Sequence, residues 1–131
     1  MKILLLGEFS NVHWTLACAL RKLGHEVTVV SNGDWWKGYP ADIRIERKYG
    51  RFDGISYLYK VLRLLPKLKG YDVVQLINPV HFIDLKAERG IHIYDYLRRH
   101  NKKVFLGAYG YDHYYVYDSI VRRTLRYCAF Y

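Results

Sequence analysis

Residues 2–30, KILLLGEFSNVHWTLACALRKLGHEVTVV, decide the fold of this chain. The run at 2–6, KILLL, is short and continuously apolar, which is typical of a strand buried on both faces of a parallel sheet. The run at 25–30, HEVTVV, is rich in β-branched residues and predicts a second strand. A helix that ends before Gly24 separates them. The stretch is therefore a βαβ unit, in which the two strands are parallel.

The helix between these strands is predicted from its apolar spacing. Apolar residues recur at intervals of three and four, as one face of an α-helix requires. Ser10 or Asn11 stands where a side chain can cap the first turn. The expected buried face consists of Val12, Leu16, Ala19, Leu20 and Leu23.

The rest of the chain continues the alternation of strands and helices. We expect strands at 42–47, 71–77 and 102–108, the first of them at an edge of the sheet. We expect helices at 54–70, shortened or kinked by Pro66, at 85–100, and in the tail from 119 onward. Right-handed crossovers then place the first strand beside the fourth. The prediction is a single three-layer, Rossmann-like α/β domain over residues 1–131, with a parallel sheet in the order 3-2-1-4-5.

Composition narrows the setting and the partners. No apolar run approaches the roughly 20 residues that cross a bilayer, and the first apolar run is too short for a signal peptide. Cys18 and Cys128 lack metal-ligand spacing, and Cys18 is expected to act as a small hydrophobe in a reducing, cytoplasmic protein. The 21 lysines and arginines exceed the 12 acids, for a net charge of +9. This excess favours nucleic acid, nucleotide phosphates or an acidic membrane face. Beyond this charge, the sequence gives no support for a nucleic-acid partner, since no helix-turn-helix, RNP-type or zinc motif is present.

Polar segments follow three of the predicted strands, at 7–13, 78–82 and 109–115. Ligands of parallel α/β sheets bind at the carboxyl ends of the strands, so these segments are the candidate site. Each residue also has a structural explanation: a turn at Gly7 or at Asn78, a cap at Ser10 or at Asp112, or a surface histidine. A metal site of His13, His81 and His113 is not favoured, because their spacing is wrong. The candidate substrate-binding residues are Gly7, Ser10, His13, Asn78, His81 and Asp112.

Known nucleotide motifs do not fit the first loop. GEFSNVH at 7–13 has one glycine, where a dinucleotide fingerprint has G-x-G-x-x-G. The second strand ends at Ser31 and Asn32, without the acid that would bind a ribose. A Walker loop and a G-x-S-x-G elbow are also missing from the sequence.

Three segments carry a resemblance to a known family. The opening at 1–31, which includes GHEVTVVS, resembles the start of GT-B glycosyltransferases of the family-four, retaining kind. YDVVQLINP at 71–79 resembles their fourth strand, and GYD at 110–112 resembles a motif after their fifth strand. The similarity extends over most of the 131 residues. The order of these segments is more specific than any one of them.

The resemblance implies a function for a larger enzyme. Such enzymes have two Rossmann-like domains, and this chain is similar to the amino-terminal, acceptor-side one. The implied activity is transfer of a sugar from a nucleotide-sugar donor to a glycan or lipid-linked acceptor, as in cell-surface polysaccharide biosynthesis. No cofactor is implied, the catalytic residues are unknown, and the chain without a donor domain is expected to be inactive. The alternative is a non-catalytic Rossmann-like module that binds a nucleotide or another anion. The tyrosines at 109–117 could stack on sugars or cover a domain interface.

The predicted helix at 54–70 has a basic face. Lys60, Arg63 and Lys67 recur at spacings of three and four residues. Two interpretations stay open: a core helix with a solvated basic face, or peripheral attachment to an anionic membrane at its inner, cytoplasmic side. The expected apolar face consists of Leu58, Val61, Leu62, Leu65 and Leu68.

Overall fold

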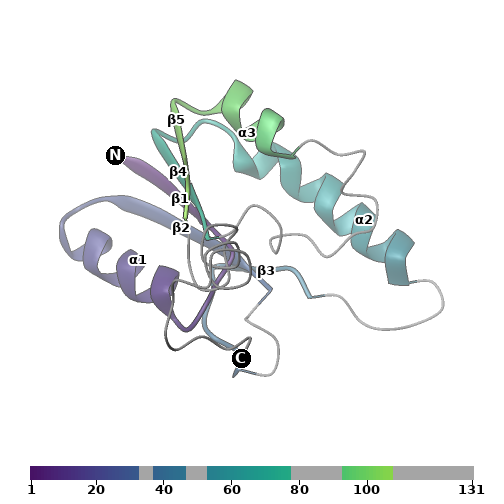
Figure 1. Cartoon of the computed structure of the whole chain (residues 1–131), viewed down its shortest axis with the longest axis horizontal. Coiled ribbons are helices and arrows are strands. Elements are labelled where there is room, and N and C mark those ends of the chain that lie inside the picture. The colour runs from purple at the N-terminus through teal and green to yellow at the C-terminus, as the bar shows by residue number, and fades with distance from the viewer. Residues whose placement is uncertain (33–36, 47–52, 78–92, 108–131) are drawn as a thin grey trace, which may run out of the picture.

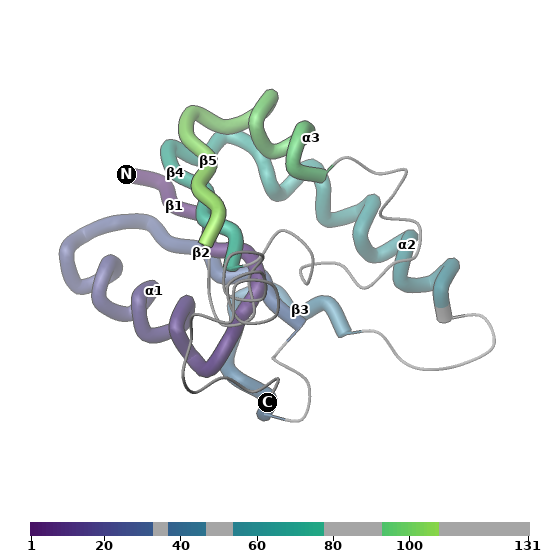
Figure 2. Tube along the Cα trace, in the orientation of Figure 1, coloured from purple at the N-terminus to yellow at the C-terminus, as the bar shows by residue number. Residues whose placement is uncertain are grey.

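The computed structural model describes residues 1–32, 37–46, 53–77 and 93–107. Strands and helices alternate along the chain (Figures 1 and 2). Their order is β1 (Lys2–Leu6), α1 (Val12–Lys22), β2 (Glu26–Ser31), β3 (Ile43–Arg44), α2 (Asp53–Leu64), the 3-10 helix η2 (Leu65–Leu68), β4 (Val73–Leu76), α3 (Ile93–His100) and β5 (Lys103–Leu106).

The predicted topology is confirmed. The five strands form one parallel sheet in the order β3-β2-β1-β4-β5. Helix α1 covers one face, and α2 and α3 cover the other (Figure 1). β1 therefore lies between β2 and β4, where the direction of strand succession reverses, and ligand sites of such sheets lie at this crevice.

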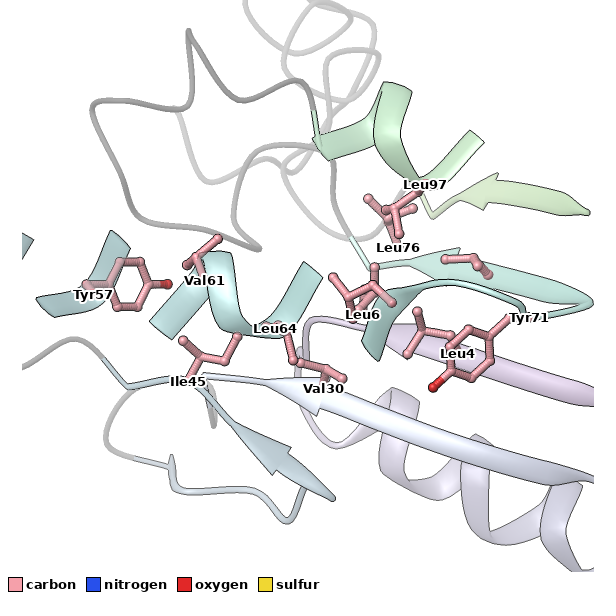
Figure 3. Close-up of a cluster of buried hydrophobic side chains, with 12 residues drawn as sticks. Leu4, Leu6, Val30, Ile45, Tyr57, Val61, Leu64, Tyr71, Leu76 and Leu97 are labelled. Atoms are coloured by element: carbon pink, nitrogen blue, oxygen red, sulfur yellow. The ribbon is translucent and has the colours of Figure 1, made fainter. Parts of the chain in front are cut away.

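Strand β1 contributes to both layers of the core. Leu4 and Leu6 face the α2 and α3 layer, while Ile3 and Leu5 pack with Ala17 of α1. These four side chains are at most 4% exposed, so β1 from Ile3 onward is buried on both faces. Figure 3 shows the larger cluster, which also includes Val30, Ile45, Tyr57, Val61, Leu64, Leu68, Tyr71, Val74, Leu76 and Leu97.

Several predicted boundaries shift by a few residues. The strand expected at 42–47 is the short edge strand Ile43–Arg44, and the others lie within a residue or two of their predicted limits. Pro66 ends the α-helical part of the segment, as expected, since α2 stops at Leu64 and continues as the 3-10 turn of η2. Of the helix predicted at 85–100, residues 93–100 form α3, while 85–92 and the tail lie outside the described residues.

The predicted buried face of α1 is partly wrong. His13 and Ala17 are the fully buried residues of this helix, whereas Leu23 is 73% exposed and Ala19 is also exposed. Helix α1 is rotated relative to the prediction, so that His13 and Ala17 face the sheet. The His13 ring bonds to the Gly7 carbonyl just after β1, and the small Ala17 side chain lets the helix approach the sheet. Cys18 is consequently exposed rather than a buried hydrophobe.

The amino-terminal edge of the sheet is held by polar side chains. Asp72, just before β4, accepts hydrogen bonds from the Lys2 N–H (2.8 Å) and from Lys102 Nζ (2.6 Å). These bonds, that with Lys102 first, lower the pKa of Asp72 from its ordinary value. Asn101 accepts from the Tyr71 N–H and donates to the carbonyls of Leu68 and Leu97, each at 2.9 Å. This edge thus ties β1, β4 and β5 together.

Candidate functional site

Gly7 is the first residue after β1, at the carboxyl end of that strand. Its N–H donates to the Val30 carbonyl (2.8 Å), and the Ile77 N–H donates to the Leu6 carbonyl (2.8 Å). Its φ is +84°, in the left-handed region, and an added Cβ would clash with Ile77 Cγ2. Packing against β4 and the backbone turn therefore account for this glycine.

Glu8 is the residue that caps α1. Its side chain is buried, and Oε1 accepts hydrogen bonds from the N–H groups of Phe9 (2.8 Å) and His13 (3.1 Å). Oε2 accepts from the Trp14 N–H (2.9 Å). Of the two expected caps, Asn11 does hold the capping position, with φ of +64°, but it makes no capping hydrogen bond through its side chain. Glu8 can cap from further back because the loop folds over itself before the helix begins.

The carboxylate and the loop satisfy the whole first turn of α1. The four N–H groups at the start of a helix otherwise lack partners, and they commonly bind phosphates or other anions. Here the Val12 N–H donates to Phe9 O (3.0 Å) and the Thr15 N–H donates to Asn11 O (3.1 Å), beside the two bonds to Glu8. A negative charge of the protein's own thus occupies the position that a phosphate takes in nucleotide-binding relatives of this fold.

His13 lies beneath the loop. It is 0% exposed, and its Nδ1 lies 2.8 Å from the Gly7 carbonyl. Burial lowers the pKa of His13 below its ordinary value of 6.5, and this outweighs the opposite effects of the Gly7 carbonyl and Glu8. The ring is therefore neutral at pH 7. Because a carbonyl can only accept, Nδ1 carries the proton, and Nε2 offers a lone pair.

Two residues at the tip of the loop have an uncommon backbone conformation. Ser10 and Asn11 have φ values of +49° and +64°, which residues other than glycine seldom adopt. Ser10 is exposed next to Phe9, which is 43% exposed. Lys37 Nζ lies 5.6 Å from the Phe9 ring centroid and 6.0 Å from that of Tyr39. The surface here combines a hydroxyl, two aromatic rings and an ammonium group.

The predicted site residues divide into two groups. Gly7, Ser10 and His13 lie together at the carboxyl end of β1, as the strand order requires. Asn78, His81 and Asp112 lie outside the described residues, as do His113 and the tyrosines at 109–117. Sequence reasoning missed Glu8 and Phe9. The signal for Glu8 was its position: it is the one acid between a buried strand and the start of a helix, whose N-terminus attracts negative charge.

Comparisons of the chain with protein-family models, with curated proteins and with solved structures gave no match. None of the helices in the described ranges combines the length and the apolar character that spanning a bilayer requires. The geometry at β1 is therefore the basis for any functional assignment.

Proposed function

We propose that this chain is the amino-terminal, acceptor-side domain of a GT-B glycosyltransferase of the family-four, retaining kind. The enzyme would transfer a sugar from a nucleotide-sugar donor to a glycan or lipid-linked acceptor. One observation carries the assignment to this half of such an enzyme: the Glu8 carboxylate occupies the N-terminus of α1. A Rossmann-like domain that binds a nucleotide uses that N-terminus for phosphate. A domain that binds sugar hydroxyls has no need of it.

The chemistry of the loop suits a neutral, hydroxyl-rich ligand. Phe9 and Ser10 are exposed and supply a ring face and a hydroxyl, the groups with which proteins stack on and bond to sugars. Glu8 and His13 are buried and hold the loop in shape. Substitution of His13 in the complete enzyme is thus expected to lower turnover through the position of Phe9 and Ser10.

The test is a titration of the isotope-labelled chain followed by amide NMR. Neutral oligosaccharides should shift the amides of Phe9 and Ser10, whereas UDP-glucose and GDP-mannose should bind weakly and without turnover. Ser10→Ala should weaken oligosaccharide binding, and Ser56→Ala, an exposed serine of α2, should not. Tight binding of a sugar nucleotide, or robust transfer by this chain, would refute the proposal.

A second candidate is a non-catalytic Rossmann-like module that binds a nucleotide or another anion. The observation in its favour is the ammonium group of Lys37, which lies within 6.0 Å of the ring centroids of both Phe9 and Tyr39. In the same titration this candidate predicts that free nucleotide shifts the amides near Lys37 and that oligosaccharides do not. The two candidates therefore differ in which ligand perturbs the loop.

A further inference from the structure

The outer side of α2 carries an exposed apolar ridge. Ile55, Tyr59 and Leu62 are 75%, 60% and 49% exposed, and their spacings of four and three residues align them along the helix. Exposed Pro66 continues the line into η2. The sequence predicts Leu62 on the buried face, and this is wrong: the α2 side chains of the buried cluster are Tyr57, Val61 and Leu64 (Figure 3). Ile55, Tyr59 and Leu62 therefore do not belong to the hydrophobic core.

A strip of cations borders the ridge. Lys60, Arg63 and Lys67 are exposed, and the Arg63 guanidinium lies 5.7 Å from the Tyr59 ring centroid. Within the described part of the chain, none of these three cations pairs with an acid. An apolar line beside cations that have no acidic partner among the described residues is the pattern of a helix that lies in the plane of a membrane surface.

Helix α3 adds a second aromatic–arginine pair to the same layer. Tyr94 is 38% exposed, with the Arg98 guanidinium 5.9 Å from its ring centroid. α3 is joined to η2 by a hydrogen bond from the Tyr96 hydroxyl to the Leu65 carbonyl (2.8 Å). Helices α2 and α3 lie on the side of the sheet opposite α1 (Figure 1). Tyrosine and arginine both combine an apolar body with a polar end, which suits the boundary between water and lipid.

We propose that the α2 ridge docks onto an anionic lipid bilayer. Ile55, Tyr59 and Leu62 would enter the boundary between headgroups and acyl chains, and the three cations would bind lipid phosphates beside them. Charge complementarity selects this occupant, since a second copy of the chain would bring the cations of two strips together. A membrane surface also accepts a convex ridge without a matching groove. The inference does not rest on the proposed function.

The experiment is co-sedimentation of the 131-residue chain with vesicles of phosphatidylcholine, alone or mixed with phosphatidylglycerol. We expect binding only to the anionic vesicles, weakened as added salt shortens the Debye length to about 8 Å. Lys60→Glu should weaken the partition coefficient at least about fivefold. Lys22→Glu makes the same charge change on α1, across the sheet, and should have a much smaller effect.

A matched apolar pair tests insertion separately from charge. Leu62→Ser should lower the partition coefficient by about fivefold, because an apolar side chain no longer enters the lipid. Leu23→Ser alters the exposed leucine at the end of α1 and should leave binding unchanged. Thermal unfolding of each variant checks that it is folded. The inference is overturned if the wild type ignores anionic vesicles at low salt, or if Leu62→Ser and Leu23→Ser bind equally well. In the first case, the ridge would be assigned to a protein partner. No sugar is present, so either result leaves the proposed function untouched.

Discussion

A carboxylate fixes the backbone at each end of the parallel strands: Glu8 at their carboxyl ends, the carboxyl edge, and Asp72 at their amino ends, the amino edge. The two differ in burial and in the sequence distance to their partners. At the carboxyl edge, Glu8 is buried and bonds three N–H groups within six residues of itself. At the amino edge, Asp72 has a side chain 31% exposed and bonds the Lys2 N–H and the Lys102 ammonium, 70 and 30 residues away. Glu8 therefore shapes one loop, whereas Asp72 connects distant strands.

The difference in burial should make Glu8 more important for stability than Asp72. Water can replace the exposed Lys102 partner of Asp72, whereas the bond from the His13 N–H to Glu8 is buried and closed to water. The carboxyl edge should consequently tolerate substitution far less than the amino edge. That asymmetry is testable with matched changes at each edge.

The largest effect is expected from a pair of glycines. Gly7→Ala should destabilise the fold by about 3–5 kcal/mol, because it adds strain at positive φ and a clash with Ile77. Gly24 near the amino edge has nearly the same φ, +82°, with open space around it, so Gly24→Ala should cost only about 1–2 kcal/mol. Urea unfolding measures both. Equal losses would mean that Ile77 yields, and that the carboxyl edge is not the tighter one.

The two carboxylates come next. Glu8→Ala should cost about 2–4 kcal/mol, since it leaves the N–H groups of His13 and Trp14 without acceptors. Glu8→Gln keeps one oxygen and should lose about half as much. Asp72→Ala is the control at the other edge and should lose clearly less than Glu8→Ala. An equal or greater loss for Asp72→Ala, measured by urea unfolding, would contradict the ranking by burial.

A smaller effect is expected from the neutral amide of the amino edge. Asn101→Ala removes three hydrogen bonds and should cost about 1–3 kcal/mol. Asn101→Asp keeps the acceptor for the Tyr71 N–H but sets a carboxylate against the carbonyls of Leu68 and Leu97. It should therefore lose more stability at pH 7 than at a pH where the new carboxyl is protonated. A pH-independent loss would mean that the amide donors matter little.

The smallest effects are expected in the pH dependence of stability, where His13 at the carboxyl edge and Asp72 at the amino edge should act in different pH ranges. The pKa of His13 is lowered from 6.5, so its contribution is complete above pH 6.5 and is lost as pH falls through its pKa in the folded protein. The pKa of Asp72 is lowered from 3.8, so its contribution is lost only as pH falls below 3.8. In urea unfolding against pH, His13→Gln should flatten the first window and Asp72→Asn the second. If His13→Gln instead removed the pH dependence of stability below pH 3.8, or Asp72→Asn removed it near pH 6.5, the assignment of these groups would be wrong.

Sequence patterns predicted the fold better than they predicted the site. The strand at 2–6 was located to the residue because a continuous apolar run has one interpretation in a buried parallel sheet. The face of α1 was misjudged because apolar spacing counts Leu23 and overlooks a histidine that a backbone carbonyl draws inward. Glu8 was missed because its three bonds depend on two successive left-handed residues, Ser10 and Asn11, and neither is a glycine that would signal such a turn. Leu62 was misplaced because periodicity finds an apolar helix but cannot show where the core ends.

The central claim is that Glu8 takes the anion position at the start of α1, so that this loop does not bind phosphate. Amide NMR of the labelled chain during titration with inorganic pyrophosphate tests it directly. The account predicts no saturable shift of the His13 and Trp14 amides in the wild type. In a folded Glu8→Ala variant, where these N–H groups are released, pyrophosphate should shift both. Saturable shifts of the two amides in the wild type, or their absence in the variant, would contradict the account.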